Sequence, residues 1–152
     1  DNLTIEIEQL DDFRRYLLFV QNQWTLNADF TYTIIEKASN RPVGQTSLYN
    51  LSFRHQRAEV GIWVGSSYWR HGLGSETLSL LCDYAFEGLH INRLEAHIFL
   101  TNTASMKIFE KHGFRQEGIN CQYVKKNGVF LDVYCYAAFS GPWRLNNGKT
   151  KV

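Results

Sequence analysis

The chain has 152 residues, which is enough for one domain with a proper core and too few for two ordinary domains. Its 16 basic and 15 acidic residues nearly cancel to a net charge of +1, so no broad surface for nucleic acid is expected. The sequence contains neither a long apolar run nor a signal peptide, which favours a cytoplasmic protein with no membrane partner.

The three cysteines do not follow a metal-binding or disulfide pattern. Cys82, Cys121 and Cys135 are odd in number, widely spaced and set among apolar residues. A zinc site or a disulfide framework needs pairs or short spacings. We therefore expect reduced thiols in the core and no metal.

The first third of the chain predicts a strand, a helix and a hairpin. Residues 3–7 alternate between apolar and polar, and Asp11 or Asp12 can cap a helix with one apolar face, formed by Phe13, Tyr16, Leu17, Val20 and Trp24. Residues 30–37 are rich in β-branched and aromatic residues, 39–42 supply a turn, and 43–48 run back. Residues 50–57 are expected to be a polar connection.

The stretch from Ala58 to Thr77 predicts a strand, a glycine-bearing loop and the start of a helix. Apolar residues alternate over 58–64, with Gly61 marking a bulge or the close approach of another backbone. A helix from about Ser75 has one buried stripe, formed by Leu78, Leu81, Cys82, Ala85 and Leu89. The free amides and positive dipole at such a helix start attract a phosphate.

The remaining elements continue the alternation of strands and helices. Residues 88–92 end the helix, and 93–99 form a strand that a crossover makes parallel to 58–64. A second helix follows over about 103–112, capped by Asn102 or Thr103 and stopped by Gly113. Asn127-Gly128 predicts a hairpin turn between 122–125 and 129–136.

The polar, basic tail begins at Gly141 and is expected to be partly disordered. With no repeat or linker, the chain is interpreted as one domain over residues 1–140, followed by the tail over 141–152.

Two motifs resemble the GNAT superfamily of acetyl-coenzyme A-dependent N-acetyltransferases. They are AEVGIWVGSSYWRHGLGSETL, similar to that family's strand and pyrophosphate loop, and NRLEAHIFLTNTASMKIFEKHGFRQEG, similar to its next strand, asparagine-led helix and Gly-Phe. Within the family, the chain is most similar to the branch of ribosomal-protein N-terminal and polyamine acetyltransferases. Residues 1–50 match only loosely.

The resemblance implies an α/β fold, with a mixed, mostly antiparallel, twisted sheet and flanking helices. Two central parallel strands would splay apart to admit the cofactor. It implies transfer of an acetyl group from acetyl-coenzyme A, as co-substrate, to a primary amine by direct attack, without a metal. The alternative is a non-catalytic acyl-coenzyme A binding or sensing domain.

The resemblance also implies a cofactor site. The pantetheine arm would lie along Ile62, Trp63 and Val64, and Asn102 would bond to it. The pyrophosphate would rest on the glycine loop, at Trp69, Arg70, His71, Gly72, Leu73, Gly74 and Ser75. Trp69 departs from the Arg or Gln of many members, although a Tyr-Trp pair is usual in the branch.

Glu59 is the favoured base, because it shares a strand face with Trp63 beside the acetyl site. A carboxylate there works best if burial raises its pKa or water relays the proton. The alternative is a structural ion pair with Arg57 or Arg93. Glu95 and His97 are weaker candidates on the neighbouring strand.

The acid that protonates the leaving thiolate is less clear from the sequence, because Phe109 stands where many members carry a tyrosine. Ser105 lies one helical turn earlier on the same face and can hold the sulfur. Tyr134, in the last hairpin, is a further candidate.

The acceptor stays open among a peptide N-terminus, a polyamine, an amino acid and an amino sugar. Several aromatic residues could line its pocket or belong to the core, namely Trp24, Phe30, Tyr32 and Tyr49. Edge strands or the hairpin over 123–136 could form a homodimer.

Overall fold

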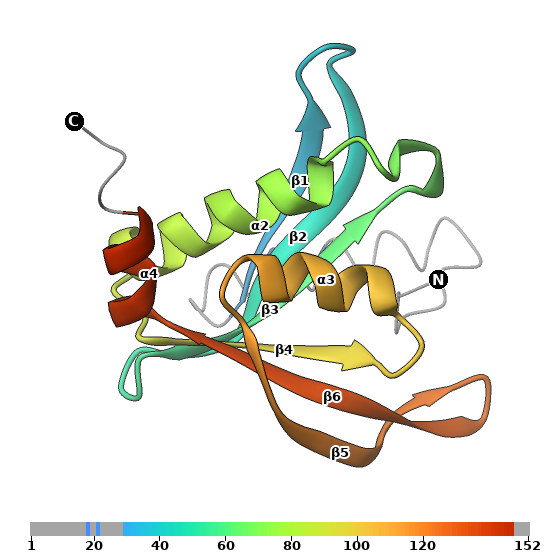
Figure 1. Ribbon diagram of the computed structural model, residues 1–152. Helices are drawn as coiled ribbons and strands as arrows, with labels where there is room; N and C mark the ends of the chain where they lie inside the picture. Colours follow the sequence, from blue (N-terminus) through green and yellow to red (C-terminus); the bar gives the residue numbers. More distant parts are fainter. Residues whose placement is uncertain (1–17, 19–20, 22–28, 148–152) are drawn as a thin grey trace.

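The computed structural model describes residues 29–147 together with Leu18 and Gln21. Six strands form one sheet in the order β1-β2-β3-β4-β6-β5 (Figure 1). The strands are β1 (Phe30–Glu36), β2 (Arg41–Ser52), β3 (Arg57–Val64), β4 (Arg93–Phe99), β5 (Arg115–Lys126) and β6 (Val129–Phe139). The helices are η1 (Ser66–Tyr68), α2 (Leu73–Asp83), η2 (Tyr84–Gly88), α3 (Thr103–Lys111) and α4 (Ser140–Asn147).

The expected α/β fold is confirmed, including the central parallel pair. β3 and β4 pair in parallel at only three positions, of which Glu59↔Glu95 is the last, while the other neighbouring strands are antiparallel. Beyond that pair β3 continues to Val64 and β4 to Phe99, and the two strands diverge (Figure 1). The sheet therefore opens at its centre, and we call this opening the gap.

The core lies on one face of the sheet, which α2 and α3 cover (Figure 1). β4 alternates as expected, with Leu94, Ala96 and Ile98 buried. The stripe of α2 packs against them through Leu78, Leu81 and Cys82. Because side chains alternate along a strand, Glu95 and His97 lie on the opposite face of the sheet.

The first hairpin differs from the prediction at its turn. Residues 37–40 form the turn, so Arg41 and Pro42 already belong to β2, opposite Glu36 and Ile35. A bulge between Ile34 and Ile35 shifts the register. At its other end β2 runs to Ser52, so the predicted polar connection over 50–57 shrinks to the turn at 53–56.

The chain after Phe139 also differs, because α4 occupies most of the predicted tail. Trp143 is 7% exposed, packs on Phe86, and donates its indole N–H to Asp83 Oδ1 at 3.0 Å. Residues 141–147 of the predicted tail are therefore helical, and the rest of the tail lies outside the described residues. Burial of one aromatic side chain anchors a segment that is otherwise polar.

Two predictions for the N-terminal region fall outside the described residues: the strand over 3–7 and the placement of Trp24. Of the predicted helix that carries Phe13 to Trp24, only Leu18 and Gln21 are described, and both are helical. No helix in the described part of the chain is long and apolar enough to cross a membrane.

Candidate active site

The open edge of β3 presents backbone groups to the gap. Gly65 N–H donates to Val43 O at 2.8 Å, beside the Gly44↔Val64 pair, which makes that pair a non-hydrogen-bonded one. By alternation, the N–H and C=O groups of Ile62 and the N–H of Val64 point away from β2 and into the gap, while Val64 O accepts from the Trp69 indole. No β4 residue pairs with β3 beyond Glu59 in the described chain, so these groups are placed to bind an extended ligand.

Gly61 accommodates neighbouring side chains rather than the bulge or close backbone approach that its position predicted. A Cβ atom there would lie 2.8 Å from Ser47 Oγ on β2. The glycine therefore accommodates a strand neighbour.

The glycine loop ends at a helix start, as predicted, although α2 begins at Leu73 rather than near Ser75. Gly72 has a left-handed backbone (φ +79°), which glycine adopts without strain. Glu76 N–H donates to Gly72 O at 3.0 Å. The amides of residues 73–75 therefore precede the first intrahelical bond and point outward at the positive end of the helix dipole.

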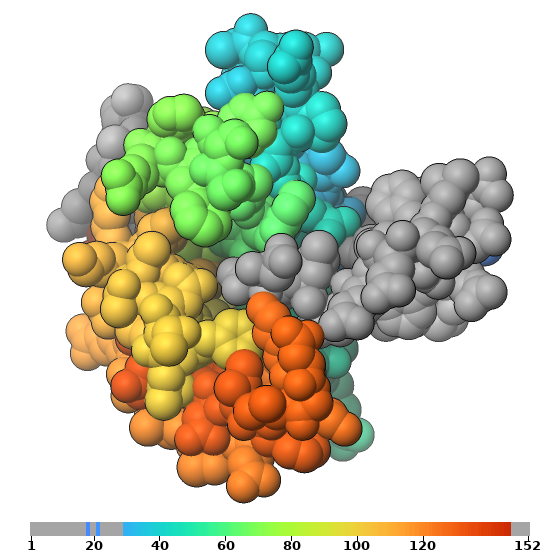
Figure 2. Space-filling view, turned by 90° about the vertical axis from the view of Figure 1, so that its right-hand side faces the viewer, coloured from blue at the N-terminus to red at the C-terminus, as the bar shows by residue number. Residues whose placement is uncertain are grey.

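Trp69 closes this loop onto β3. Its indole N–H donates to Val64 O at 2.7 Å, while the ring stays 64% exposed. Arg70 and His71 are exposed beside it. From the end of the molecule in Figure 2, the loop and the start of α2 (green) and the β5–β6 hairpin (orange) flank the residues after β4 (yellow).

Asn102 caps α3, since its side-chain oxygen accepts from Ser105 N–H at 3.1 Å. Gly113 stops the helix with φ +82°, as predicted. The Ser105 side chain is half-buried. Tyr134 is paired with Ile98 and packs against the core, so it lies on the face that the helices cover.

Phe109 belongs to the core rather than to an open site. It is 5% exposed, and its ring meets Phe114 edge-on with centroids 4.9 Å apart.

Phe109→Tyr should therefore lower the free energy of unfolding by about 1–3 kcal/mol, because the added hydroxyl enters an apolar environment. Urea denaturation measures this change, with Phe130→Tyr as the control, since Phe130 is 56% exposed. Unchanged stability together with faster thiol release would instead show that the ring edge opens toward the cofactor.

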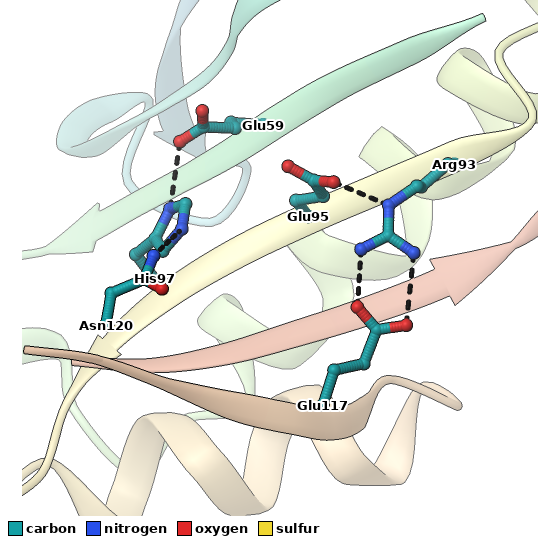
Figure 3. Close-up of polar contacts among 6 residues, drawn as sticks. All are labelled: Glu59, Arg93, Glu95, His97, Glu117 and Asn120. Atoms are coloured by element: carbon teal, nitrogen blue, oxygen red, sulfur yellow. Dashed lines mark hydrogen bonds and ion pairs between the residues drawn. The ribbon is translucent and has the colours of Figure 1, made fainter.

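The side chains of Glu59 and His97 meet across β3 and β4, at the point where the two strands part (Figure 3). His97 Nδ1 lies 2.9 Å from Glu59 Oε2, and Asn50 Nδ2 donates to Glu59 Oε1 at 2.9 Å. The side chains of Glu59 and His97 are only 12% and 13% exposed. Arg93, the alternative partner of Glu59, binds Glu95 and Glu117 instead (Figure 3).

The hydrogen bonds around Glu59 change its acidity in the direction opposite to burial. Burial favours the neutral form, but hydrogen bonds from His97, Asn50 and Tyr49 outweigh it and hold the pKa of Glu59 below its usual range. Of the two conditions under which a carboxylate base would work best, a pKa raised by burial is therefore not met for Glu59.

His97 is held by neighbours from the last hairpin. Its ring stacks on Tyr123, with centroids 4.5 Å apart and planes 24° apart. Asn120 Nδ2 lies 3.4 Å from His97 Nε2 (Figure 3). A polar cavity of about 250 Å³ adjoins this ring, lined by side chains that include His97, Glu95, Glu117, Asn120 and Cys135.

Glu95 has a structural role, because its carboxylate accepts from Arg93 Nε. Arg93 also binds Glu117 through two nitrogens, and this contact keeps the pKa of Glu117 low. Cys135 lies opposite His97 in the register. Burial and the nearby Glu95 raise the pKa of the Cys135 thiol.

The cysteine prediction holds only in part. All three thiols are free, but Cys82 is the one that is buried, since Cys121 is exposed and Cys135 half-buried. In the described residues, no group of three or more His, Cys, Asp or Glu side chains could hold a metal ion.

The aromatic residues that were candidates for an acceptor pocket lie in different parts of the structure. Phe30 is buried in the core, and Tyr32 lines another cavity of about 300 Å³, between β1 and α2, far along the sheet from His97. Tyr49 contacts Glu59. No sequence pattern pointed to Asn50, Asn120 or Tyr123 as site residues. They reach the site through the extension of β2 and the bulges of β5.

A model of the acetyltransferase (GNAT) domain matches residues 6–115 of the chain. The uncharacterized N-acetyltransferase p20 of Bacillus licheniformis is 33% identical over 106 residues, which cover 70% of this chain and 60% of the relative. The chain thus spans less than two thirds of that relative's length.

Solved structures share the fold. A probable acetyltransferase superposes with a TM-score of 0.84 at 24% identity, covering 91% of this chain and 76% of that one. Mycobacterium smegmatis RimJ in complex with CoA-disulfide superposes with a TM-score of 0.79 at 21% identity, covering 91% and 69%.

Proposed function

Because the chain belongs to the GNAT acetyltransferase family, we propose that it transfers an acetyl group from acetyl-coenzyme A to a primary amine by direct attack. The observation that carries the proposal is the end of β3–β4 pairing at Glu59↔Glu95. It leaves backbone groups of β3 open on one side of the gap, next to the amide-bearing start of α2.

The cofactor would bind along this open edge. The backbone groups of Ile62 and the N–H of Val64 suit the amides of the pantetheine arm, and the amides of residues 70–75 suit the pyrophosphate. Asn102, which caps α3, has a second lone pair on its side-chain oxygen for the arm. When bound, acetyl-coenzyme A supplies the thioester, and the chain supplies the backbone donors that position and polarise it.

The groups proposed to deprotonate the amine and those proposed to protonate the thiolate lie on opposite faces of the sheet. The Glu59–His97 pair lies on the face opposite the helices and serves to deprotonate the amine. Ser105 and Tyr134 lie on the helix-covered side and are the proposed donors to the leaving thiolate.

The acceptor is proposed only as a primary amine. Relatives carry names for different acceptors, including the L-amino acid N-acetyltransferase AaaT of Escherichia coli and the spermidine N(1)-acetyltransferase of Vibrio cholerae. Both acceptors present a primary amine, which matches the base and the polar cavity beside it.

The test is release of free thiol from acetyl-coenzyme A across a panel of peptide, amino acid, polyamine and amino sugar acceptors. Release that depends on the acceptor, with the acetylated amine identified by mass spectrometry, supports the proposal. Binding of acetyl-coenzyme A without release for any acceptor would favour a non-catalytic binding domain.

Trp69→Phe should weaken acetyl-coenzyme A binding about 3- to 10-fold and leave kcat nearly unchanged. It removes one hydrogen bond that closes the loop onto Val64, and such a bond contributes about 0.5–1.5 kcal/mol. Calorimetric titration measures Kd, with Tyr68→Phe in the same loop as the control. An unchanged Kd would show that the loop keeps its shape without this bond.

A further inference from the structure

Glu59 is poorly placed to receive a proton from a substrate directly. Asn50 occupies its Oε1 and His97 its Oε2, each at 2.9 Å, and Tyr49 also hydrogen-bonds to the carboxylate. The side chain is 12% exposed and does not line the polar cavity. A carboxylate with both oxygens engaged can orient a neighbour more readily than it can accept a new proton.

His97 has the complementary arrangement. A carboxylate beside Nδ1 favours the tautomer with hydrogen on Nδ1, which leaves the lone pair on Nε2. Among the described residues, Nε2 is contacted by Asn120 Nδ2 alone, at 3.4 Å, a long and weak hydrogen bond that an entering amine can displace. His97 itself lines the cavity of about 250 Å³.

We infer that His97 accepts the proton of the acceptor amine at Nε2, that the amine enters through the polar cavity, and that Glu59 acts through His97 as a positioning residue. This inference rests on the acetyl transfer proposed above. It moves the base from β3 to β4 and makes Tyr123 and Asn120 part of the support of the catalytic ring.

The step balances with the groups present. The amine nitrogen attacks the acetyl carbonyl carbon, so a C–N bond forms and the C–S bond breaks. The proton from nitrogen goes to Nε2, the electron pair of the broken bond leaves with sulfur as thiolate, and Glu59 stabilises the imidazolium through Nδ1–H. Imidazole suits this role because it exchanges protons near neutral pH.

Charged and titratable groups surround His97 on every neighbouring strand. They are Tyr49 on β2, Glu59 on β3, Arg93 and Glu95 on β4, Glu117 and Tyr123 on β5, and Cys135 on β6. Cys135 is the one nucleophile among them that suggests a covalent acetyl intermediate. Its raised pKa keeps the thiol protonated, which favours direct attack.

The first test is spectroscopic and needs no substrate. Nitrogen–proton correlation spectra of the histidine rings should show His97 as the Nδ1–H tautomer. Glu59→Ala should convert it mainly to the Nε2–H tautomer, because the acceptor at Nδ1 is gone. An Nε2–H tautomer in the unmodified protein would overturn the inference, since Nε2 then has no lone pair to offer.

The second test is kinetic. His97→Ala should lower kcat/KM for the amine at least 100-fold, within the range for loss of a general base, with acetyl-coenzyme A affinity within about threefold. Added imidazole should restore at least a tenth of the lost factor by filling the vacated space. His55→Ala, an exposed histidine in the β2–β3 turn, is the matched control and should keep full activity.

Several outcomes would overturn the inference. Activity within about threefold of the unmodified protein, or a loss that imidazole does not relieve, would assign His97 a structural role. A loss in Cys135→Ser equal to that in His97→Ala, with an acetylated protein trapped, would indicate the covalent route. If His97→Ala does not fold, His97→Gln is judged by the same activity thresholds.

Failure of the proposed function can be distinguished from failure of the inference about His97. It would appear as an unmodified protein that no amine stimulates, whereas the tautomer measurement tests the geometry of His97 independently of turnover.

Discussion

Glu59→Gln should lower kcat/KM for the amine by about 100-fold, equivalent to about 2.7 kcal/mol of transition-state stabilisation. Glutamine keeps the size of the side chain but removes the charge that stabilises imidazolium and that fixes the tautomer of His97 across the 2.9 Å contact. The affinity for acetyl-coenzyme A should change less than threefold, because the glycine loop proposed to hold the pyrophosphate lies beyond the end of β3. Initial-rate thiol release and calorimetry measure the two quantities.

Glu87→Gln is the matched control, because Glu87 is also an ion-paired carboxylate but lies on the exposed surface with Arg144. It should leave activity unchanged. The double variant Glu59→Gln/His97→Ala should be no slower than His97→Ala alone, since residues that act in series are not additive. Full activity of Glu59→Gln would remove this carboxylate from the reaction.

Glu59→Gln should also make the free energy of unfolding depend less steeply on pH in the acid range. The pKa of Glu59 is lowered in the folded state, so its stabilisation is present above the unfolded value of about 4.3 and is lost as pH falls through the folded value. The stability difference between the unmodified protein and Glu59→Gln should therefore shrink below about pH 4. Urea denaturation at pH 7 and pH 3 measures it.

Trp143→Ala should lower the free energy of unfolding by about 3–5 kcal/mol, the usual cost of truncating a buried aromatic side chain. Trp143 is 7% exposed, contacts Phe86, and binds Asp83 through its indole N–H. Its loss leaves a cavity under α4 and an unpaired carboxylate on α2. Urea or thermal denaturation measures the change.

Leu145→Ala tests whether the effect belongs to the helix or to the tryptophan. Leu145 is in the same helix but 73% exposed, so its truncation should change stability by less than about 0.5 kcal/mol. Trp143→Phe should fall between the two, because it keeps ring packing and loses the hydrogen bond. A loss below about 1 kcal/mol in Trp143→Ala would show that α4 does not stabilise the domain.

The sequence predicted the elements whose signals are local. Strict alternation located Leu94, Ala96 and Ile98 on the buried face of β4, and the asparagine at 102 and glycine at 113 marked the ends of α3. The parallel pairing of β3 and β4 followed from the helix that connects them. The strand alternation and the helix ends depend on residues within one or two turns, and the parallel pairing depends on the order of consecutive elements.

The contacts of the site could not be predicted in the same way. Asn50 reaches Glu59 only because β2 continues past the expected strand end, and Asn120 and Tyr123 reach His97 only because bulges bend β5. The direction of the Glu59 pKa depends on those partners rather than on burial alone. α4 was missed because a single tryptophan in a polar segment has no periodicity to detect.

The parting of β3 and β4 has a kinetic consequence. Glu59 and His97 lie on one face of the sheet beside the gap, while α2 and α3 cover the other face. Under the function proposed above, the donor along the open edge of β3 and the amine in the polar cavity would occupy the protein together, so neither would have to depart before the other arrives. For acetyl transfer across such a gap, double-reciprocal plots at several fixed donor concentrations should intersect rather than run parallel.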